Sequence, residues 1–158
     1  MADRDLLGIA TTAKIAAHPI HPMLVPFPIA LLTATLVCDL IFWGNGNGFW
    51  AQAAFWTLTG AIITALLAAL AGFADFLSNA RIRAISDAWH HMLGNLFLVV
   101  LAIVNWWLRY TGDVAQAVIP WGLILSVVIM AVLLYTGWKG GELVYRWRVG
   151  MQPEDSIE

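Results

Sequence analysis

Four long apolar stretches leave this chain few choices of fold. Each is long enough to cross a bilayer, because a helix needs about 20 residues to span the hydrocarbon core. The composition agrees, since 61% of the 158 residues are hydrophobic and 11% are charged, whereas a soluble domain is about 45–50% apolar and about 25% charged. The sequence therefore predicts an all-α integral membrane protein, a single domain over residues 1–158 with four transmembrane helices in an up-down bundle. The predicted spans are residues 23–43, 49–73, 89–108 and 118–138.

Basic residues predict how this bundle lies in the membrane. Lys and Arg in short loops stay on the cytoplasmic side, and an even number of spans places both termini on one side. The opposite side has only Arg109. We therefore expect both termini in the cytoplasm. The basic residues on the side of the termini are Arg4, Lys14, Arg81, Arg83, Lys139, Arg146 and Arg148.

The two ends of the chain are short and polar. Residues 1–17 mix charges with Leu and Ile, which indicates a short helix on the membrane surface, and residues 151–158 indicate an acidic tail without structure. The early charges and the modest apolar run that follows them are not typical of a cleavable signal peptide. Cys38, the single cysteine, lies inside the first span and has no intrachain disulfide partner.

A proline-rich segment with two histidines precedes the first span. Residues 18–28 are HPIHPMLVPFP. Proline biases the residue before it toward extended geometry, so each residue that precedes a proline is expected to be extended, His18 and His21 among them. Proline is tolerated in the first turn of a helix, and the regular helix is therefore expected to begin near Pro26 or Pro28.

All four histidines lie at the predicted cytoplasmic ends of the spans, where an up-down bundle can bring distant residues together. Neutral imidazoles bind transition metal ions and the two axial faces of haem. We therefore expect haem b or a transition metal ion as the cofactor. The alternative is that the histidines only donate hydrogen bonds to main-chain carbonyls or lipid phosphates. The predicted haem ligands are His18, His21, His90 and His91, and the predicted metal ligands are these four together with Asp75 and Glu142.

Three further polar residues are predicted to support this site. On a helix, Asp87 lies three and four residues before the two adjacent histidines, and Asn95 shares a face with the second of them. Arg146 follows Glu142 by four residues and is expected to neutralise it. Because metal-binding imidazoles often bond a carboxylate through their second nitrogen, we expect a nearby carboxylate within about 3 Å of a histidine nitrogen.

Two patterns concern residues inside the spans. Small residues recur at helical spacing in the second span, among them Gly60 and Gly72, and such a stripe lets helices approach closely in lipid. Asp39 lies near the outer end of the first span, where we expect a snorkelling or hydrogen-bonded carboxylate rather than a proton relay.

A weak internal symmetry relates the two halves of the chain. His21 and Asp75 in the first half correspond to His90 and Glu142 in the second. Parallel duplicated hairpins would produce this pattern, although any two helical hairpins also have polar ends.

Several of these motifs together resemble the bacterial membrane family catalogued as domain of unknown function 2231. They are the double His-Pro opening at residues 18–31, Asp39, the sequence GFAD at residues 72–75, the residues from His90 to Asn95, and GWKGGELVYR at residues 137–146. They cover nearly the whole chain. The resemblance implies a multi-pass protein of the bacterial inner (cytoplasmic) membrane. Some relatives joined to Rieske-type iron–sulfur domains imply electron transfer, yet this chain lacks such a domain and its one cysteine cannot hold a cluster.

The leading functional hypothesis is a membrane redox component that binds haem b or a metal through histidines at the cytoplasmic end of the bundle. The competing hypothesis is a non-catalytic assembly or structural subunit, in which the small-residue stripe mediates oligomers. A small transporter is a third option, which the scarcity of polar residues in mid-membrane disfavours. The expected partners are the lipid bilayer and either a second copy or a redox partner protein, with no nucleic acid. The sequence assigns no catalytic residue.

Overall fold

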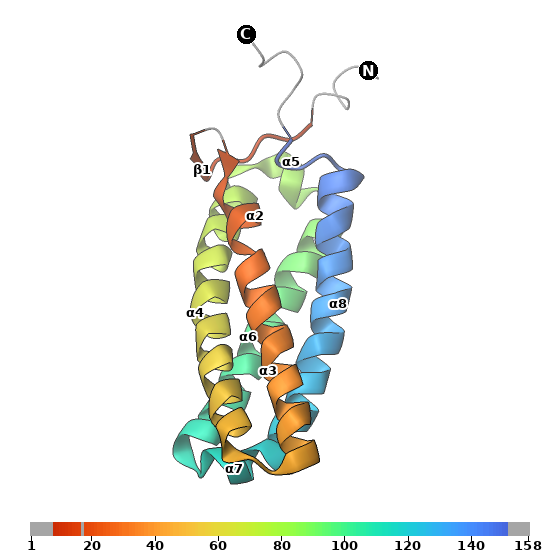
Figure 1. Cartoon of the computed structure of the whole chain (residues 1–158). Coiled ribbons are helices and arrows are strands. Elements are labelled where there is room, and N and C mark those ends of the chain that lie inside the picture. Colours follow the sequence, from red (N-terminus) through yellow and green to blue (C-terminus); the bar gives the residue numbers. More distant parts are fainter. Residues whose placement is uncertain (1–7, 17, 152–158) are drawn as a thin grey trace.

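The computed structural model describes residues 8–16 and 18–151, and four long helices dominate it (Figure 1). They are α3 (Pro26–Asn45), α4 (Gly48–Ser78), α6 (Ser86–Thr111) and α8 (Leu123–Tyr145). Together with the short helices that lead into α3 and α8, they form four segments long and apolar enough to cross a membrane. The predicted four-helix membrane fold is confirmed, whereas the cytoplasmic location of the termini stays a prediction.

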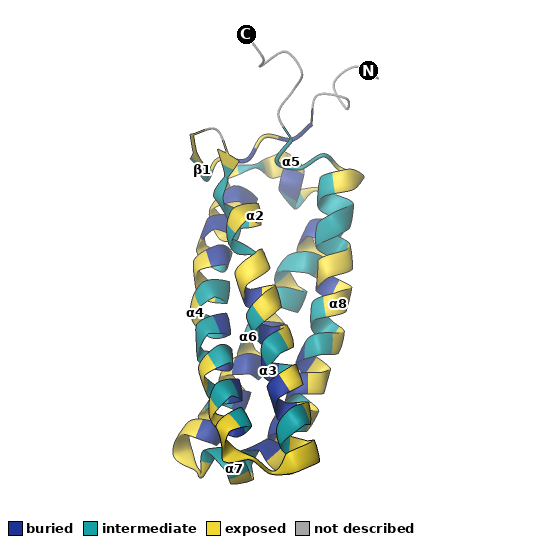
Figure 2. Cartoon of the chain, in the orientation of Figure 1, coloured by how far each residue is buried: buried dark blue, intermediate teal, exposed yellow. Residues whose placement is uncertain are grey.

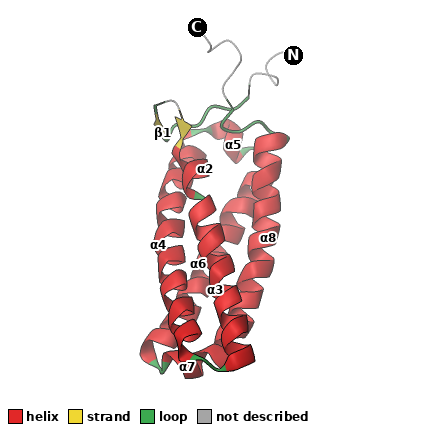
Figure 3. Ribbon diagram, viewed as in Figure 1, coloured by secondary structure: helices red, strands yellow, loops and turns green. Residues whose placement is uncertain are grey.

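Short elements connect the long helices, and little of the described chain lies outside helices (Figure 3). The first strand, β1 (Lys14–Ile15), pairs antiparallel with β2 (His18–Pro19). One turn of helix, α2 (Ile20–Leu24), leads into α3, and α5 (Ala80–Arg83) joins α4 to α6. A further turn, α7 (Val114–Ala117), and a π-helical turn, η1 (Val118–Gly122), lead into α8. We call the two ends of the bundle the α5 end and the α7 end.

Proline determines where the first long helix begins. Helix α3 begins at Pro26, as the sequence predicts, because the missing N–H of a proline costs nothing in a first turn. The expected extended geometry holds for His18, which lies in β2, but is wrong for His21, Val25 and Phe27, the last of which lies in α3. His21 lies in α2 and Val25 has helical dihedrals. The helical turn is retained because the amide N–H of Val25 donates to the carbonyl of His21, 3.1 Å away.

The two polar ends of the chain meet across the α5 end. Ile9 forms a parallel bridge with Val149, and its amide donates to the carbonyl of Arg148. Residues 8–16 are irregular apart from β1, so the part of the expected surface helix that the structure describes is not helical. The rest of that expectation, at residues 1–7 and 17, and the expected tail at 152–158 lie outside the described residues.

Buried residues lie on the sides of the helices that face one another, and exposed residues lie on the outside (Figure 2). The outer surface is apolar, since Leu70 and Trp56 are 70% and 66% exposed. A soluble protein rarely leaves so much apolar surface in water, but a lipid bilayer covers it without cost. The central core consists of Leu32, Leu58, Ala61, Leu98, Ala102 and Ile129.

The chain folds as two similar hairpins that run in the same direction. Hairpin 1 comprises α2, α3 and α4, and hairpin 2 comprises α6, α7, η1 and α8. Buried residues of α3 recur on α6 after 70 residues: Pro28 and Leu98, Leu32 and Ala102, Thr35 and Asn105, Asp39 and Arg109. Buried residues of α4 recur on η1 and α8 after 68 residues: Ala54 and Gly122, Leu58 and Ser126, Ala61 and Ile129, Ala68 and Thr136.

This repeat agrees with the predicted internal symmetry but corrects its register. His21 corresponds to His91, at the same interval of 70 residues, and not to His90. By the interval of 68 residues, Asp75 corresponds to Leu143 and not to Glu142. A helix turns about 100° per residue, so a shift of one residue separates the histidine that faces the bundle from the one that does not. Both hairpins start at the α5 end, and α3 lies diagonally from α6 as α4 does from α8. We therefore infer that they are parallel repeats related by a pseudo-twofold axis along the bundle.

Candidate functional site

Two of the four histidines come together inside the bundle at the α5 end. His21 lies in α2 and His91 lies in the second turn of α6. Helix α6 lies diagonally opposite α3 in the bundle, since each of them packs on α4 and α8. Their ring centroids are 6.0 Å apart and their planes are perpendicular, at 90°. Both side chains are half-buried. Because they are equivalent residues of the two hairpins, the pseudo-twofold axis passes between them.

The two imidazoles make the same hydrogen bond, each within its own hairpin. His21 Nδ1 lies 2.8 Å from the carbonyl oxygen of Ala68, and His91 Nδ1 lies 2.9 Å from that of Thr136. A carbonyl oxygen can only accept, so in both rings Nδ1 carries the proton. In a neutral imidazole the other nitrogen then has a lone pair, and Nε2 of each ring is the atom available to bind a ligand.

Each imidazole also packs against a glycine. This glycine lies on the helix that supplies the carbonyl, one turn after it in the chain. A Cβ atom on Gly72 would lie 2.9 Å from His21 Nδ1, and one on Gly140 would lie 2.9 Å from His91 Cε1. Both distances are shorter than an ordinary contact, so no side chain fits at either position without displacing a ring. Carbonyl and glycine are therefore parts of one repeated cradle that orients each imidazole.

The other two histidines make only local hydrogen bonds on the exposed surface. His18 Nδ1 lies 2.7 Å from the carbonyl of Ala16, and His90 Nδ1 lies 2.9 Å from that of Ser86. Among residues 8–16 and 18–151, no three His, Cys, Asp or Glu side chains are grouped so that they could hold one metal ion. The six predicted metal ligands are therefore not assembled in the described structure.

The predicted carboxylates bind other partners. Asp75 Oδ1 accepts hydrogen bonds from the amides of Thr12 and Ala13, at 2.7 and 2.8 Å, and so ties down the segment before α2. Asp87 pairs with Lys139 at 2.8 Å. The carboxylate that we expected on a histidine nitrogen is replaced by main-chain carbonyls, which a helix leaves accessible where no side chain covers it.

The remaining predicted residues stay near the pair or neutralise each other. Asn95 donates from Nδ2 to the carbonyl of His91 at 2.7 Å, and its Oδ1 accepts from Thr136 at 3.4 Å. Arg146 lies 3.6 Å from Glu142 in the expected i,i+4 pair. Asn95 therefore bonds both to α6, which carries His91, and to α8, which His91 contacts. The Glu142–Arg146 pair lies on the partly exposed face of α8.

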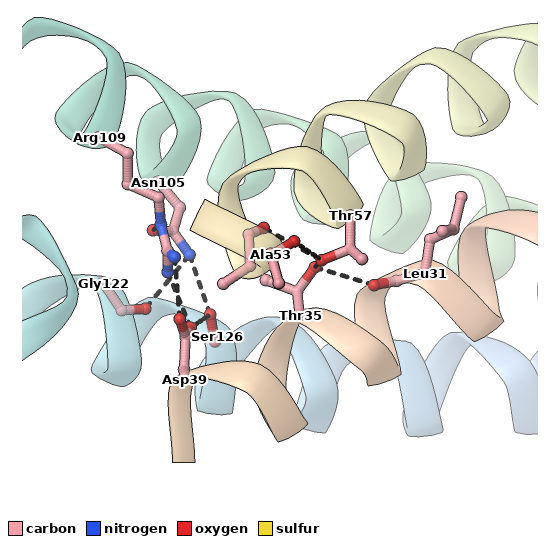
Figure 4. Close-up of polar contacts among 10 residues, drawn as sticks. Leu31, Thr35, Asp39, Ala53, Thr57, Asn105, Arg109, Gly122 and Ser126 are labelled. Carbon is pink, nitrogen blue, oxygen red and sulfur yellow. Dashed lines mark hydrogen bonds and ion pairs between the residues drawn. The ribbon is translucent and has the colours of Figure 1, made fainter. Parts of the chain in front are cut away.

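A second polar cluster, at the α7 end, joins the two hairpins and was missed by the sequence analysis (Figure 4). Arg109 donates from Nη1 and Nη2 to the two carboxylate oxygens of Asp39, both at 2.8 Å. Ser126 donates to Asp39 Oδ2 at 2.7 Å, and Arg109 Nε donates to Asn105 at 3.0 Å. Both charged side chains are fully buried. Asp39 is thus hydrogen-bonded inside the bundle and does not reach out to the interface.

A signal for this pair is present in the sequence. Asp39 is the only carboxylate within the four predicted spans, and Arg109 is the only basic residue on its side of the membrane. An ionisable group at that depth needs a partner, because hydrocarbon offers none. The two residues occupy equivalent positions in the repeat, so the pseudo-twofold axis also passes between them.

The small-residue stripe of α4 packs within hairpin 1. A Cβ atom on Gly60 would lie 3.3 Å from Leu31, and Gly72 faces His21. Thr35 on α3 and Thr57 on α4 share a hydrogen bond of 3.0 Å along the same interface. These glycines therefore contact hairpin 1 itself, and the predicted oligomer stays a prediction.

An apolar groove runs beside α2 at the α5 end. His18, Pro22 and Met23 line it, and the last two follow His21 directly in the chain. Val144 and Met151, from the other end of the chain, line it as well. The groove therefore adjoins the segment that carries one of the paired histidines.

Fold and site together define a membrane protein of two repeated helical hairpins with an imidazole pair and an ion pair on their common axis. The chain belongs to the family described as Predicted membrane protein (DUF2231), whose model matches residues 17–153. The resemblance drawn from the sequence motifs is thereby confirmed. No curated protein and no solved structure matches the chain.

Proposed function

We propose that this protein is a membrane electron-transfer component in which His21 and His91 bind one haem b. The observation that carries the proposal is the pair of equivalent imidazoles on the pseudo-twofold axis. Each has Nδ1 bonded to a main-chain carbonyl and Nε2 left as an acceptor. This is the arrangement that fixes the tautomer and plane of an imidazole for ligation through Nε2.

The repeat favours a ligand that both imidazoles would share. At the α7 end the equivalent residues differ, Asp39 against Arg109, and bind each other directly. At the α5 end they are identical, and two acceptor nitrogens cannot bond to each other. A single electron-pair acceptor on the axis, such as an iron atom, would satisfy both imidazoles in the same way.

The spacing of the two rings suits two ligands on one metal atom. A metal–nitrogen bond is about 2 Å long, so two imidazoles that held one metal between them would have ring centroids about 6 Å apart. The observed separation is 6.0 Å. A metal ion without a macrocycle ordinarily takes at least four ligands, and no group of three candidate side chains exists in the described residues. Haem requires two from the protein, which favours haem b over a metal ion.

Haem iron with two histidine ligands would supply a one-electron redox step without an open coordination position. The chain's own residues would hold the two imidazoles through Ala68, Thr136, Gly72 and Gly140, and the apolar helices would exclude water. Electron transfer therefore suits the pair better than a reaction that needs a substrate on the iron. A redox partner protein at the α5 end is the partner that this proposal implies.

Optical spectra of the purified protein test the proposal. The chain, expressed in cells that synthesise haem and purified in a mild detergent, is expected to contain one haem per chain with a low-spin, six-coordinate spectrum. Since the two imidazole planes are perpendicular, the ferric form is expected to give a strongly anisotropic low-spin signal in electron paramagnetic resonance. Elemental analysis of the same sample distinguishes haem iron from another metal.

The adjacent histidines of α6 supply a matched control. His91→Ala should abolish the low-spin spectrum or convert it to a five-coordinate one, whereas His90→Ala should leave it unchanged because His90 binds Ser86 on the surface. The corresponding pair in hairpin 1 is His21→Ala and His18→Ala. A purified protein without a Soret band, or equal losses in His90→Ala and His91→Ala, would contradict the proposal.

A further inference from the structure

The two polar contacts on the pseudo-twofold axis lie at opposite ends of the same diagonal pair of helices. His21 and Asp39 are 18 residues apart along α2 and α3, and His91 and Arg109 are 18 residues apart along α6. At a rise of about 1.5 Å per residue, this places the two contacts about 27 Å apart, close to the thickness of the hydrocarbon core. The Asp39–Arg109 bond therefore joins the hairpins at one end, and the imidazole pair lies between them at the other end.

We propose that Asp39 and Arg109 are positioning residues that set the separation of His21 and His91. The inference rests on the proposed function for its purpose, but its geometry stands without it. If the hairpins rotated or tilted against each other at the α7 end, stiff helices would carry that movement to the α5 end. The distance between the imidazoles would change with it.

Three features make this ion pair suited to fix the hairpins. Helices pack more extensively within each hairpin than between the two, so the relative placement of the hairpins rests on fewer contacts. The bidentate bond, with both oxygen–nitrogen distances at 2.8 Å, allows little rotation of one helix against the other. Finally, Ser126 and Asn105 extend the cluster to α8, because both belong to the same hydrogen-bonded group.

The difference in sign between the equivalent residues has a physical reason. In an unmodified repeat, the same residue would face itself across the axis at this position, and two aspartates or two arginines would repel. Opposite charges allow a direct bond, and they also define which side of each hairpin faces the other. A charge exchange should therefore preserve the contact, because positions 39 and 109 are equivalent in the repeat.

Distance measurement between spin labels tests the inference without haem. Labels at Leu77→Cys and Tyr145→Cys, in a Cys38→Ser background, report the separation of the hairpins at the α5 end. Leu77 and Tyr145 are 67% and 84% exposed and belong to different hairpins. Asp39→Asn should shift and broaden the distance distribution. The exchanged variant, Asp39→Arg with Arg109→Asp, should restore most of the original distribution.

Controls separate positioning from general loss of structure. Asp113→Asn neutralises an exposed carboxylate at the same end, where it caps α7, and should leave the distribution unchanged. If Asp39→Asn does not fold, Arg109→Lys decides, because it keeps the charge but loses the bidentate bond and should shift the distribution in the same direction. An unchanged distribution in whichever of these two variants folds would overturn the inference.

The optical spectrum of the same variants links the inference to the proposed site. In Asp39→Asn the haem should remain bound but pass partly from the six-coordinate to the five-coordinate form, and the exchanged variant should reverse this change. A wild-type protein without haem whose label distances still respond to Asp39→Asn would refute the haem proposal alone. Bound haem with neither spectrum nor distance altered would refute the positioning role alone.

Discussion

Replacing Gly140 by alanine tests whether the imidazole cradle is as tight as the structure indicates. The new Cβ atom would lie 2.9 Å from His91 Cε1 and 3.0 Å from Nδ1, where ordinary contacts begin at 3.4 Å. The ring must therefore move by about 0.5 Å or more, away from a position that its 2.9 Å hydrogen bond to Thr136 now defines. Loss of that hydrogen bond costs about 1 kcal/mol.

The magnitude follows from three terms. Overpacking a well-filled site costs about 1–3 kcal/mol, which together with the lost hydrogen bond gives about 2–4 kcal/mol. Alanine offsets about 1 kcal/mol of this through its higher helix propensity, so the net loss of unfolding free energy should be about 1–3 kcal/mol. Gly137, three residues earlier on α8, has no atom within 4 Å of the corresponding Cβ position. Gly137→Ala should therefore gain up to about 1 kcal/mol.

Unfolding of both variants in detergent micelles, followed by circular dichroism during titration with a denaturing detergent, measures the difference. We expect Gly140→Ala to be less stable than Gly137→Ala by about 2–4 kcal/mol, the sum of the overpacking and hydrogen-bond terms. Equal stability of the two variants would show that the cradle yields without cost. The cradle would then not be what orients the imidazole.

Three further predictions concern the ion pair, the polar end segment and the orientation. Asp39→Ala leaves a buried arginine without its partner and should lower the unfolding free energy by about 3–5 kcal/mol. Glu142→Ala removes one member of a partly exposed pair at 3.6 Å and should lower the unfolding free energy by less than about 1 kcal/mol. Asp75→Asn weakens the acceptor for two amides and should speed hydrogen exchange in the segment before α2. Exchange in α8 should stay unchanged, which would show that the protein has not unfolded as a whole. If the termini are cytoplasmic, a thiol reagent that cannot cross the membrane should label Gly46→Cys in intact cells. The same reagent should label Arg81→Cys only in inverted vesicles. The reverse pattern would refute the orientation.

Helix positions were predictable because they depend on local properties. The apolar runs identify the four spans, and Pro26 indicates where α3 begins. Between α3 and α4, Gly46 lies in the left-handed region at φ 65°, which glycine adopts without strain. Each of these features depends on a few neighbouring residues, so one sequence suffices to predict it.

The candidate site was predictable only in part. The sequence indicated that histidines from two helices would lie at one end, but it did not separate His91 from His90. That choice depends on how each helix is rotated about its own axis, which the packing of α4 against α3 and of α8 against α6 determines. The expected carboxylate partner was wrong for a related reason, because a glycine on the neighbouring helix exposes a carbonyl that no sequence pattern reveals.

The sequence by itself determined that this protein is a four-helix membrane protein with histidines at one end, since hydrophobic length and proline placement act locally. Only the tertiary structure decided that the halves are repeats with intervals of 70 and 68 residues. It alone paired Asp39 with Arg109, which lie 70 residues apart in the chain. In lipid a buried charge must find its partner across the bundle, and which partner lies within reach depends on the rotation and depth of whole helices.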